Sequence, residues 1–191
     1  MVKKNQFKLD LSHWDFLSRL AGSLWPYICK YYGEQVEMPK TVVAFVSEKM
    51  FKRFLKRFNL SRSVQKEYGR PGDIRKAHML YVGSVSPDPH GPETYRLIAI
   101  RKPKLQKARR FLIKHFQQDF SLPETLLLGL IHETIHSYEE TTGRTCLNHS
   151  TTPVTEAEKS IFMWFKKDHP EYFSSQTEKN MHKTLRKIPD H

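Results

Sequence analysis

The sequence predicts an α+β protein with a small sheet of about three strands and helices packed around it. Three apolar, partly β-branched runs, at 41–46, 78–82 and 94–100, have the length and composition of strands. Before, between and after them, apolar residues recur at intervals of three and four, which is the spacing of amphipathic helices. One of these helical stretches contains the string HETIH at 132–136, which matches the pattern HExxH.

The composition is that of a globular protein. Of its 191 residues, 38% are hydrophobic and 12% aromatic, enough for a real core. We expect one domain over residues 1–173, followed by a polar helix or tail over 174–191. The longest apolar run, 126–131, is too short to cross a bilayer, and the basic N-terminus has no apolar segment behind it. The expectation is a cytoplasmic protein without membrane contact, and its two isolated cysteines fit a reducing compartment.

The first half of the chain is expected to supply the sheet. A helix is predicted over 12–31, with a kink or restart at Pro26. The strand at 41–46 should be followed by a helix that begins at Ser47. The strand at 94–100 is a candidate edge of the sheet, against which an extended peptide could lie.

The second half is expected to be helical. A helix over 105–116 should turn its basic side outward. After the helix that carries HExxH, another is predicted over 154–167, opened by Thr151 or Thr152. The sequence Asp-His-Pro at 168–170 should end it, because the residue before a proline disfavours helix.

The HExxH string lies in a segment with the signals of a well-defined helix. Ser121 can cap its start, and an apolar face follows at helical spacing. Residues four apart share one face of a helix, so His132 and His136 can hold a single zinc ion. Glu133, on the flank of that face, can take a proton from a water that the zinc activates.

Two histidines do not complete a catalytic zinc site, which needs a third protein ligand and an open position for water. A straight helix cannot easily bring its own third ligand round to the same ion. The following helix can supply one if it packs against the first. The available side chains are Glu139, Glu140, His149, Glu156 and Glu158. Among them Glu158 shares the apolar face of the following helix, and Glu156 lies beside that face.

The segment 121–173 resembles the gluzincin group of HExxH metallopeptidases and is similar to small HExxH proteins of phages and prophages. In that group a glutamate near the start of a second helix follows the motif, and Thr155-Glu156-Ala157 occupies its place. The resemblance implies a compact, minimal zincin fold and zinc bound by His132, His136 and Glu156. It also implies hydrolysis of peptide bonds in a protein or peptide substrate, with Glu133 as general base. Ser160 stands where thermolysin-type enzymes have a supporting aspartate.

A second resemblance is to SprT-like proteases, which use HExxH and a later histidine. The segment 128–138 is close to their active-site helix, and His149 falls near the right distance. Ser150 stands where their histidine is followed by glycine, and their zinc ribbon is absent from this sequence. This resemblance implies a DNA-associated protease with His149 as the third zinc ligand.

The net charge of +12 is concentrated in two blocks, at 49–76 and 101–114, and the second contains no acidic residue. Such blocks can bind the phosphates of a nucleic acid, with an affinity that falls as salt rises. They can equally be solvated surface that keeps the protein soluble. Together with the HExxH motif, they leave open a third reading: a non-catalytic module that keeps zinc for its fold and binds nucleic acid or a protein partner.

Overall fold

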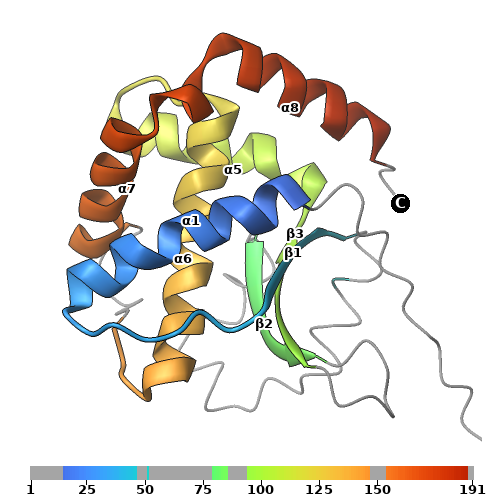
Figure 1. Ribbon diagram of the computed structural model, residues 1–191. Helices are drawn as coiled ribbons and strands as arrows, with labels where there is room; N and C mark the ends of the chain where they lie inside the picture. The colour runs from blue at the N-terminus through green and yellow to red at the C-terminus, as the bar shows by residue number, and fades with distance from the viewer. Residues whose placement is uncertain (1–14, 47–50, 52–78, 86–93, 147–153, 189–191) are drawn as a thin grey trace, which may run out of the picture.

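The computed structural model describes residues 15–46, 51, 79–85, 94–146 and 154–188, and it is an α+β protein (Figure 1). The elements in chain order are α1 (Asp15–Tyr32), β1 (Thr41–Phe45), β2 (Met79–Val85), β3 (Tyr95–Ile100), α5 (Lys102–Phe116), α6 (Leu122–Thr142), α7 (Glu156–Asp168), the 3-10 helix η2 (Pro170–Phe173) and α8 (Ser175–Lys187). The three predicted strands and the helices predicted within these ranges are confirmed. Of the helix predicted from Ser47, only Phe51 is described, and it is buried.

The strands form a mixed sheet in the order β1-β3-β2. β3 pairs in parallel with β1 and antiparallel with β2, so it is the central strand. The prediction that 94–100 forms an edge is therefore wrong. Nearly every side chain of β3 is buried, which is what a strand covered on both faces requires. Within this sheet the edge strands are β1 and β2.

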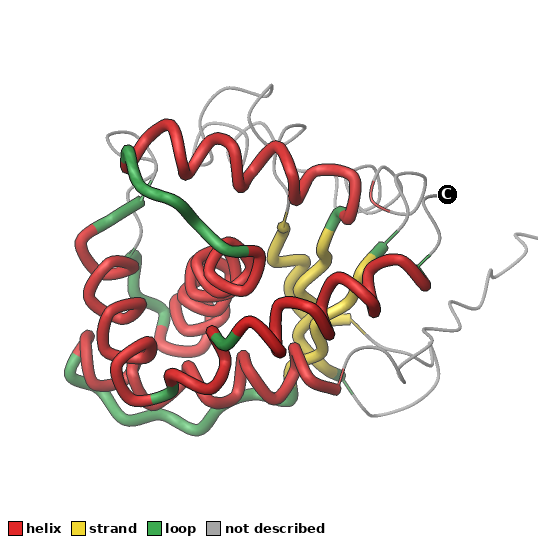
Figure 2. Tube along the Cα trace, turned by 90° about the horizontal axis from the view of Figure 1, so that it is seen from above, coloured by secondary structure: helices red, strands yellow, loops and turns green. Residues whose placement is uncertain are grey.

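Helix α6 is the centre of the helical part of the molecule (Figure 1). It packs against β2, α1, α5, α7 and α8. Seen from above, α6 is viewed nearly along its axis, with α5 and α8 on either side of its N-terminal end (Figure 2). Because neighbours surround it, α6 is apolar on almost every side, and fifteen of its residues are buried.

The ends of α6 are fixed by local sequence. Ser121 and Glu124 form a capping box, in which each side chain accepts a hydrogen bond from the other's backbone N–H. At the other end, Gly143 has φ of 71°, a left-handed conformation that glycine adopts without strain. The predicted start at Ser121 is confirmed, so the register of HExxH on the helix is well defined.

Two local predictions need correction. Of the kink or restart predicted at Pro26, the restart is absent: α1 continues through Pro26, and Leu24, Trp25 and Ile28 of the surrounding turn are buried in the core. α7 begins at Glu156, with Thr155 as its cap, rather than after Thr151 or Thr152. The capping box that Thr155 forms with Glu158 determines this start.

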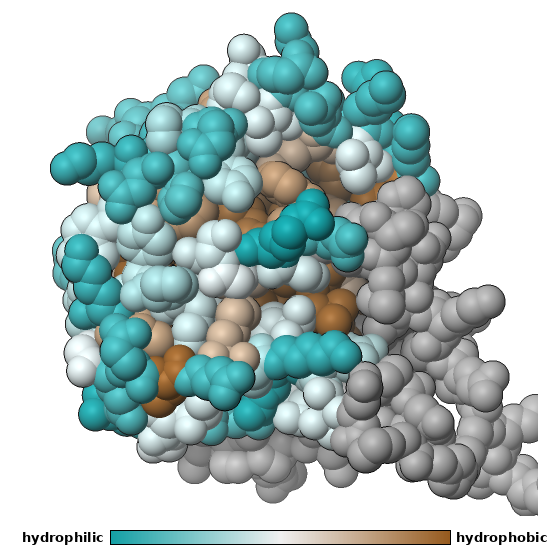
Figure 3. All heavy atoms as spheres, viewed as in Figure 1, coloured by the Kyte–Doolittle hydropathy of each residue, from teal (hydrophilic) through white to brown (hydrophobic). Residues whose placement is uncertain are grey.

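Figure 3 shows hydrophilic side chains gathered over α8 at the top of the molecule, with apolar colour mostly in the gaps between them. Helix α8 was predicted as a polar helix or tail, and the structure shows a helix from Ser175 to Lys187. Among the helices described here, none combines the length and the apolar character needed to cross a membrane.

Candidate metal centre

The two motif histidines lie one turn apart on α6 and face the same side. Their ring centroids are 5.0 Å apart, and the planes are nearly perpendicular at 85°. The side chain of His136 is 6% exposed and that of His132 is 27% exposed. One ring is thus held inside the protein, while the other reaches toward solvent.

His132 is held by a carboxylate from the next helix. Its Nδ1 lies 2.7 Å from Oε1 of Glu158. Glu158 is buried in the first turn of α7, where its Oε2 accepts a hydrogen bond of 2.5 Å from the backbone N–H of Thr155. The capping box that starts α7 therefore also sets the position of the His132 ring.

His136 is held by a carboxylate from its own helix. Its Nδ1 lies 2.7 Å from Oε2 of Glu139, one turn further along α6. The other oxygen of Glu139 accepts a hydrogen bond of 2.6 Å from the backbone N–H of Cys146. Glu139 thus connects His136 to the chain that leaves α6.

Both histidines have the environment that is common for zinc ligands. A histidine that binds a metal through one ring nitrogen usually has the other hydrogen-bonded to a carboxylate or carbonyl, which fixes the tautomer and the ring orientation. His132 and His136 each make this contact through Nδ1. Nε2 is then the nitrogen through which each ring would bind a metal.

The carboxylates also determine the protonation of the site. Burial lowers the pKa of His132, but the hydrogen bond that its ring N–H donates to Glu158 and the nearby charges of Glu133, Glu158 and Glu139 raise it more, to about 9. Burial raises the pKa of Glu158, but its contacts with His132 and Thr155 lower it by a larger amount. The pKa of Glu158 is therefore below its ordinary value. Without a metal, the His132 ring is therefore protonated at neutral pH and lies beside an ionised Glu158.

Glu133 lies on the side of α6 that faces the sheet. It is 8% exposed, and its Oε2 accepts a hydrogen bond of 2.6 Å from the backbone N–H of Tyr81 in β2. A register shift between Tyr81 and Gly83 marks a β-bulge at this point, and Gly83 has φ of 83°. Bulges re-orient the backbone next to functional sites. The predicted general base is therefore in contact with an edge strand.

Tyr81 contacts three parts of this site. Besides its N–H at Glu133, its ring stacks at 6.4 Å and 21° on the ring of His136. Its hydroxyl donates a hydrogen bond of 2.6 Å to Oε2 of Glu140, which also forms an ion pair with Arg96 of β3. The sequence around Tyr81 carries no signal of this position, because nothing in the sequence places β2 against α6.

The residues predicted as possible third ligands lie in different environments. Glu156 is 79% exposed at the start of α7, with Oε1 2.6 Å from Nζ of Lys159. Glu158 contacts His132 through Nδ1. His149 lies outside the described residues. Within the parts of the chain that the structure describes, no group of three or more His, Cys, Asp or Glu side chains is arranged to hold a metal.

Tyr138, two residues after the motif on α6, is fully buried. Its hydroxyl donates to the carbonyl oxygen of Glu34 at 3.4 Å, and its ring stacks on Tyr32 at 5.3 Å. Trp25 packs edge-on against the same ring at 5.8 Å. Tyr138 is therefore part of the core between α1 and α6.

The chain was compared with models of known protein families, with curated proteins and with solved structures, and none of the three comparisons gave a match.

Proposed function

We propose that this protein is a zinc-dependent metallopeptidase whose active site is built on α6. The observation that carries the proposal is the pair of carboxylates at the HExxH histidines. Glu158 and Glu139 each lie 2.7 Å from Nδ1 of a motif histidine. Two surface histidines that face only water would not need buried or half-buried carboxylates in these positions.

The donor set fits zinc, which is bound by imidazole nitrogen and by carboxylate oxygen. His132 and His136 would supply two ligands through Nε2. Glu156 is the third ligand in this proposal, as the gluzincin resemblance implies, and it would have to leave Lys159 to bind the metal. Glu158 would instead keep His132 in position, since its carboxylate already contacts Nδ1 of that ring.

Zinc in this site would polarise a substrate carbonyl and bring the pKa of a water toward 7. The chain's own part is proton transfer. Glu133 uses Oε2 to accept the N–H of Tyr81, so Oε1 is the oxygen we assign to take the proton of the attacking water. Glu133 would then pass this proton to the leaving amine.

The substrate would lie along β2 rather than along β3. β2 is the edge strand that packs against α6, and its backbone reaches Glu133 at Tyr81. An extended peptide can add to an exposed strand edge through main-chain hydrogen bonds. This arrangement would bring the scissile bond next to the general base.

The test combines metal analysis with a comparison of two glutamate variants. Glu133→Gln keeps the shape of the side chain and removes the base, so it should bind zinc like the wild type and hydrolyse no peptide. Glu171→Gln, at an exposed glutamate that pairs only with His169 among described contacts, is the matched control and should keep full activity. Wild-type protein that takes up no zinc under loading conditions would contradict the proposal, as would full activity of Glu133→Gln.

A second candidate function is supported by the surface of α5, which has exposed cations and no acidic residue. In that case the chain would be a DNA-associated protease of SprT-like type, with proteolysis stimulated by DNA. If zinc were bound and no peptide were cleaved, with or without DNA, a non-catalytic zinc-containing module that binds nucleic acid or a partner would be the better proposal.

A further inference from the structure

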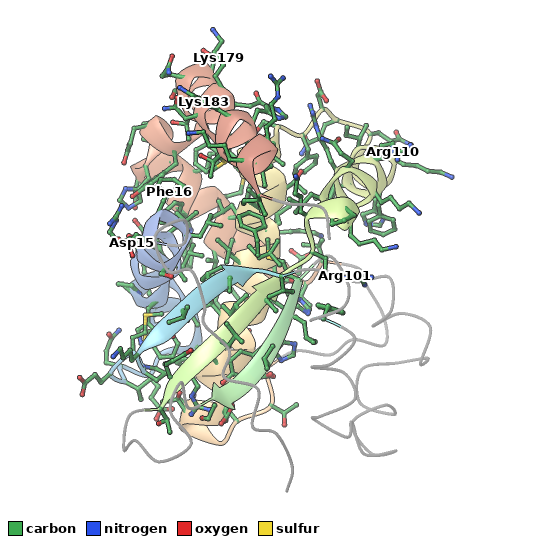
Figure 4. The ribbon with its side chains drawn as sticks, turned by 90° about the vertical axis from the view of Figure 1, so that its right-hand side faces the viewer. Asp15, Phe16, Arg101, Arg110, Lys179 and Lys183 are labelled. Carbon is green, nitrogen blue, oxygen red and sulfur yellow. The ribbon has the colours of Figure 1, made fainter. Side chains whose placement is uncertain are left out.

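Helix α5 presents a row of cations to solvent. Lys107, Arg110 and Lys114 are exposed and follow one another at intervals of three and four, so they share one face. Along the axis the row spans about 10 Å, from a rise of about 1.5 Å per residue. Arg110 lies on the outward side of α5, at the rim of the molecule (Figure 4).

An aromatic side chain lies within this row. Phe111 is 53% exposed, although phenylalanine is usually buried. Its ring stacks on that of His115 at 5.9 Å, with an angle of 5° between the planes. The two rings are parallel to each other and lie next to Arg110 and Lys114 in the sequence of the helix.

The cations of this row are not used to hold the fold together. Arg109, on another side of α5, donates to the carbonyl oxygen of Phe120 and lies 3.8 Å from Asp119. Arg110, by contrast, bonds only to the Gln106 carbonyl of its own helix at 3.3 Å among the contacts described. Lys107 and Lys114 form no ion pair with any residue that the structure describes.

We propose that this face of α5, defined by Lys107, Arg110, Phe111 and Lys114, binds single-stranded nucleic acid. Lys107, Arg110 and Lys114 would contact successive phosphates, and Phe111 would stack on a base. Single-strand-binding surfaces combine cations that follow the backbone with aromatic rings that accept any base. In a duplex the base faces are covered by their neighbours, so Phe111 would have no partner.

The charge and apolar pattern of α5 argues against an anionic membrane as the partner. A helix that lies on a membrane needs a broad apolar face toward the lipid. The apolar residues Leu105 and Leu112 are buried in the protein core. Phe111 is the one large apolar side chain that α5 exposes. A single ring among cations fits base stacking better than insertion into lipid.

This proposal stands apart from the metallopeptidase proposal. No residue of the α5 face belongs to the candidate metal centre, and binding requires neither zinc nor Glu133. Failure of either proposal can therefore be recognised separately, since nucleic-acid binding can be measured on the Glu133→Gln protein.

The first experiment measures the salt dependence of binding to a fluorescein-labelled oligothymidylate of about 20 nucleotides, long enough to cover one site. The variant is Lys107→Gln/Arg110→Gln/Lys114→Gln. The matched control is Lys179→Gln/Lys183→Gln/Arg186→Gln on α8, which removes the same charge from another exposed surface (Figure 4). Each phosphate contact contributes about 0.7 to the slope of log K against log salt for single strands.

We expect the α5 variant to lower the magnitude of that slope by about 2, because three contacts are lost. The α8 variant should leave the slope unchanged. Equal effects of both variants would show non-specific attraction to a basic protein and would overturn the proposal. A loss confined to the α8 variant would overturn it as well, in favour of the α8 surface.

The second experiment isolates stacking at Phe111. Phe111→Leu keeps an apolar side chain but removes the ring, and we expect it to weaken binding by about 5-fold or more. Phe111→Trp keeps a flat ring and should bind at least as tightly as the wild type. Thermal unfolding of each variant checks that the fold is retained. Unchanged binding by Phe111→Leu would contradict the stacking role.

Two further probes decide the class of partner. A hairpin duplex of the same length should bind more weakly than the single strand, and its tighter binding would overturn the proposal. Vesicles of phosphatidylcholine and phosphatidylserine should not compete with the oligonucleotide. If they displaced it, or if the oligonucleotide did not bind at low salt, the α5 face would not be a nucleic-acid site.

Discussion

The Nδ1 atom of His132 lies 2.7 Å from Oε1 of Glu158, so the first histidine of the HExxH motif is connected to the first turn of the following helix. This contact joins residues that are 26 positions apart. The packing of α7 on α6 therefore affects the position of His132 in the candidate metal centre.

Replacing Glu158 by Gln should weaken zinc binding without abolishing it. The amide has nearly the same shape as the carboxylate but carries no charge. The His132 ring therefore keeps a hydrogen-bond partner, but this partner raises the basicity of the ring less than a carboxylate does. Loss of such a supporting group typically costs about 10–100-fold in affinity. A competitive chelator titration above pH 9, where the His132 ring is neutral in both proteins, measures the change, and Glu171→Gln is the unaffected control. An affinity equal to that of the wild type would show that Glu158 does not position His132 for zinc.

The third ligand is tested by comparing Glu156→Ala with His149→Ala. If Glu156 binds the metal, its removal leaves an incomplete site, and zinc affinity should fall far more than in Glu158→Gln. His149→Ala should keep most of the zinc. Lys159→Met is informative beside them, because it removes the cation that pairs with Glu156 at 2.6 Å. It should leave zinc affinity equal or slightly higher. The opposite order of Glu156→Ala and His149→Ala would assign the ligand to His149.

Zinc affinity should rise with pH up to about 9. The pKa of His132 is raised to about 9, so without metal the ring is protonated at neutral pH. Zinc needs the neutral ring, and each bound ion therefore displaces a proton. Below pH 9 this single proton predicts an increase of about tenfold per pH unit. Titration against a chelator of known pH dependence measures the slope. Glu158→Gln removes the main cause of the raised pKa and should flatten it.

The capping box of α6 should give a stability that depends on pH. Glu124 accepts hydrogen bonds from Ser121 N at 2.7 Å and from Lys166 Nζ at 2.5 Å. Burial raises the pKa of Glu124, but these contacts lower it by a larger amount, so the pKa in the folded protein lies below the ordinary 4.5. The stabilisation is therefore complete above pH 4.5 and is lost as the pH falls through the folded pKa.

Glu124→Gln is expected to lower the free energy of unfolding by about 1 kcal/mol at pH 7, because Gln keeps the capping box and loses the charge. The difference from wild type should disappear in acid. Urea unfolding of both proteins at several pH values measures it. Glu171→Gln is the matched control, since it removes an exposed carboxylate that pairs with His169 and should change stability little at any pH.

The sequence by itself determined the local structure on which the site is built. Ser121 and Gly143 define the ends of α6 through hydrogen bonds within a few residues, so they could be read without knowledge of the fold. The spacing of His132 and His136 placed both on one face for the same reason. The three strands can also be predicted from composition, because short runs rich in β-branched and apolar residues favour the extended conformation of a strand.

The tertiary structure decided which partners meet. Glu156 and Glu158 are both in the first turn of α7, and the rotation of that helix determines which one faces α6. Ile161, Phe162 and Phe165 are buried and set this rotation. Glu158 shares their face, a signal that the sequence contained, but a motif spacing alone favoured Glu156.

The contact between Glu133 and Tyr81 could not be predicted at all. Its two residues are 52 positions apart, on a helix and on an edge strand. β3 is central because its two edges pair with β1 and with β2, and nearly all its side chains are buried. Local sequence encodes elements through short-range hydrogen bonds and periodicity, whereas the arrangement of Tyr81 against Glu133 results from burial of the whole core.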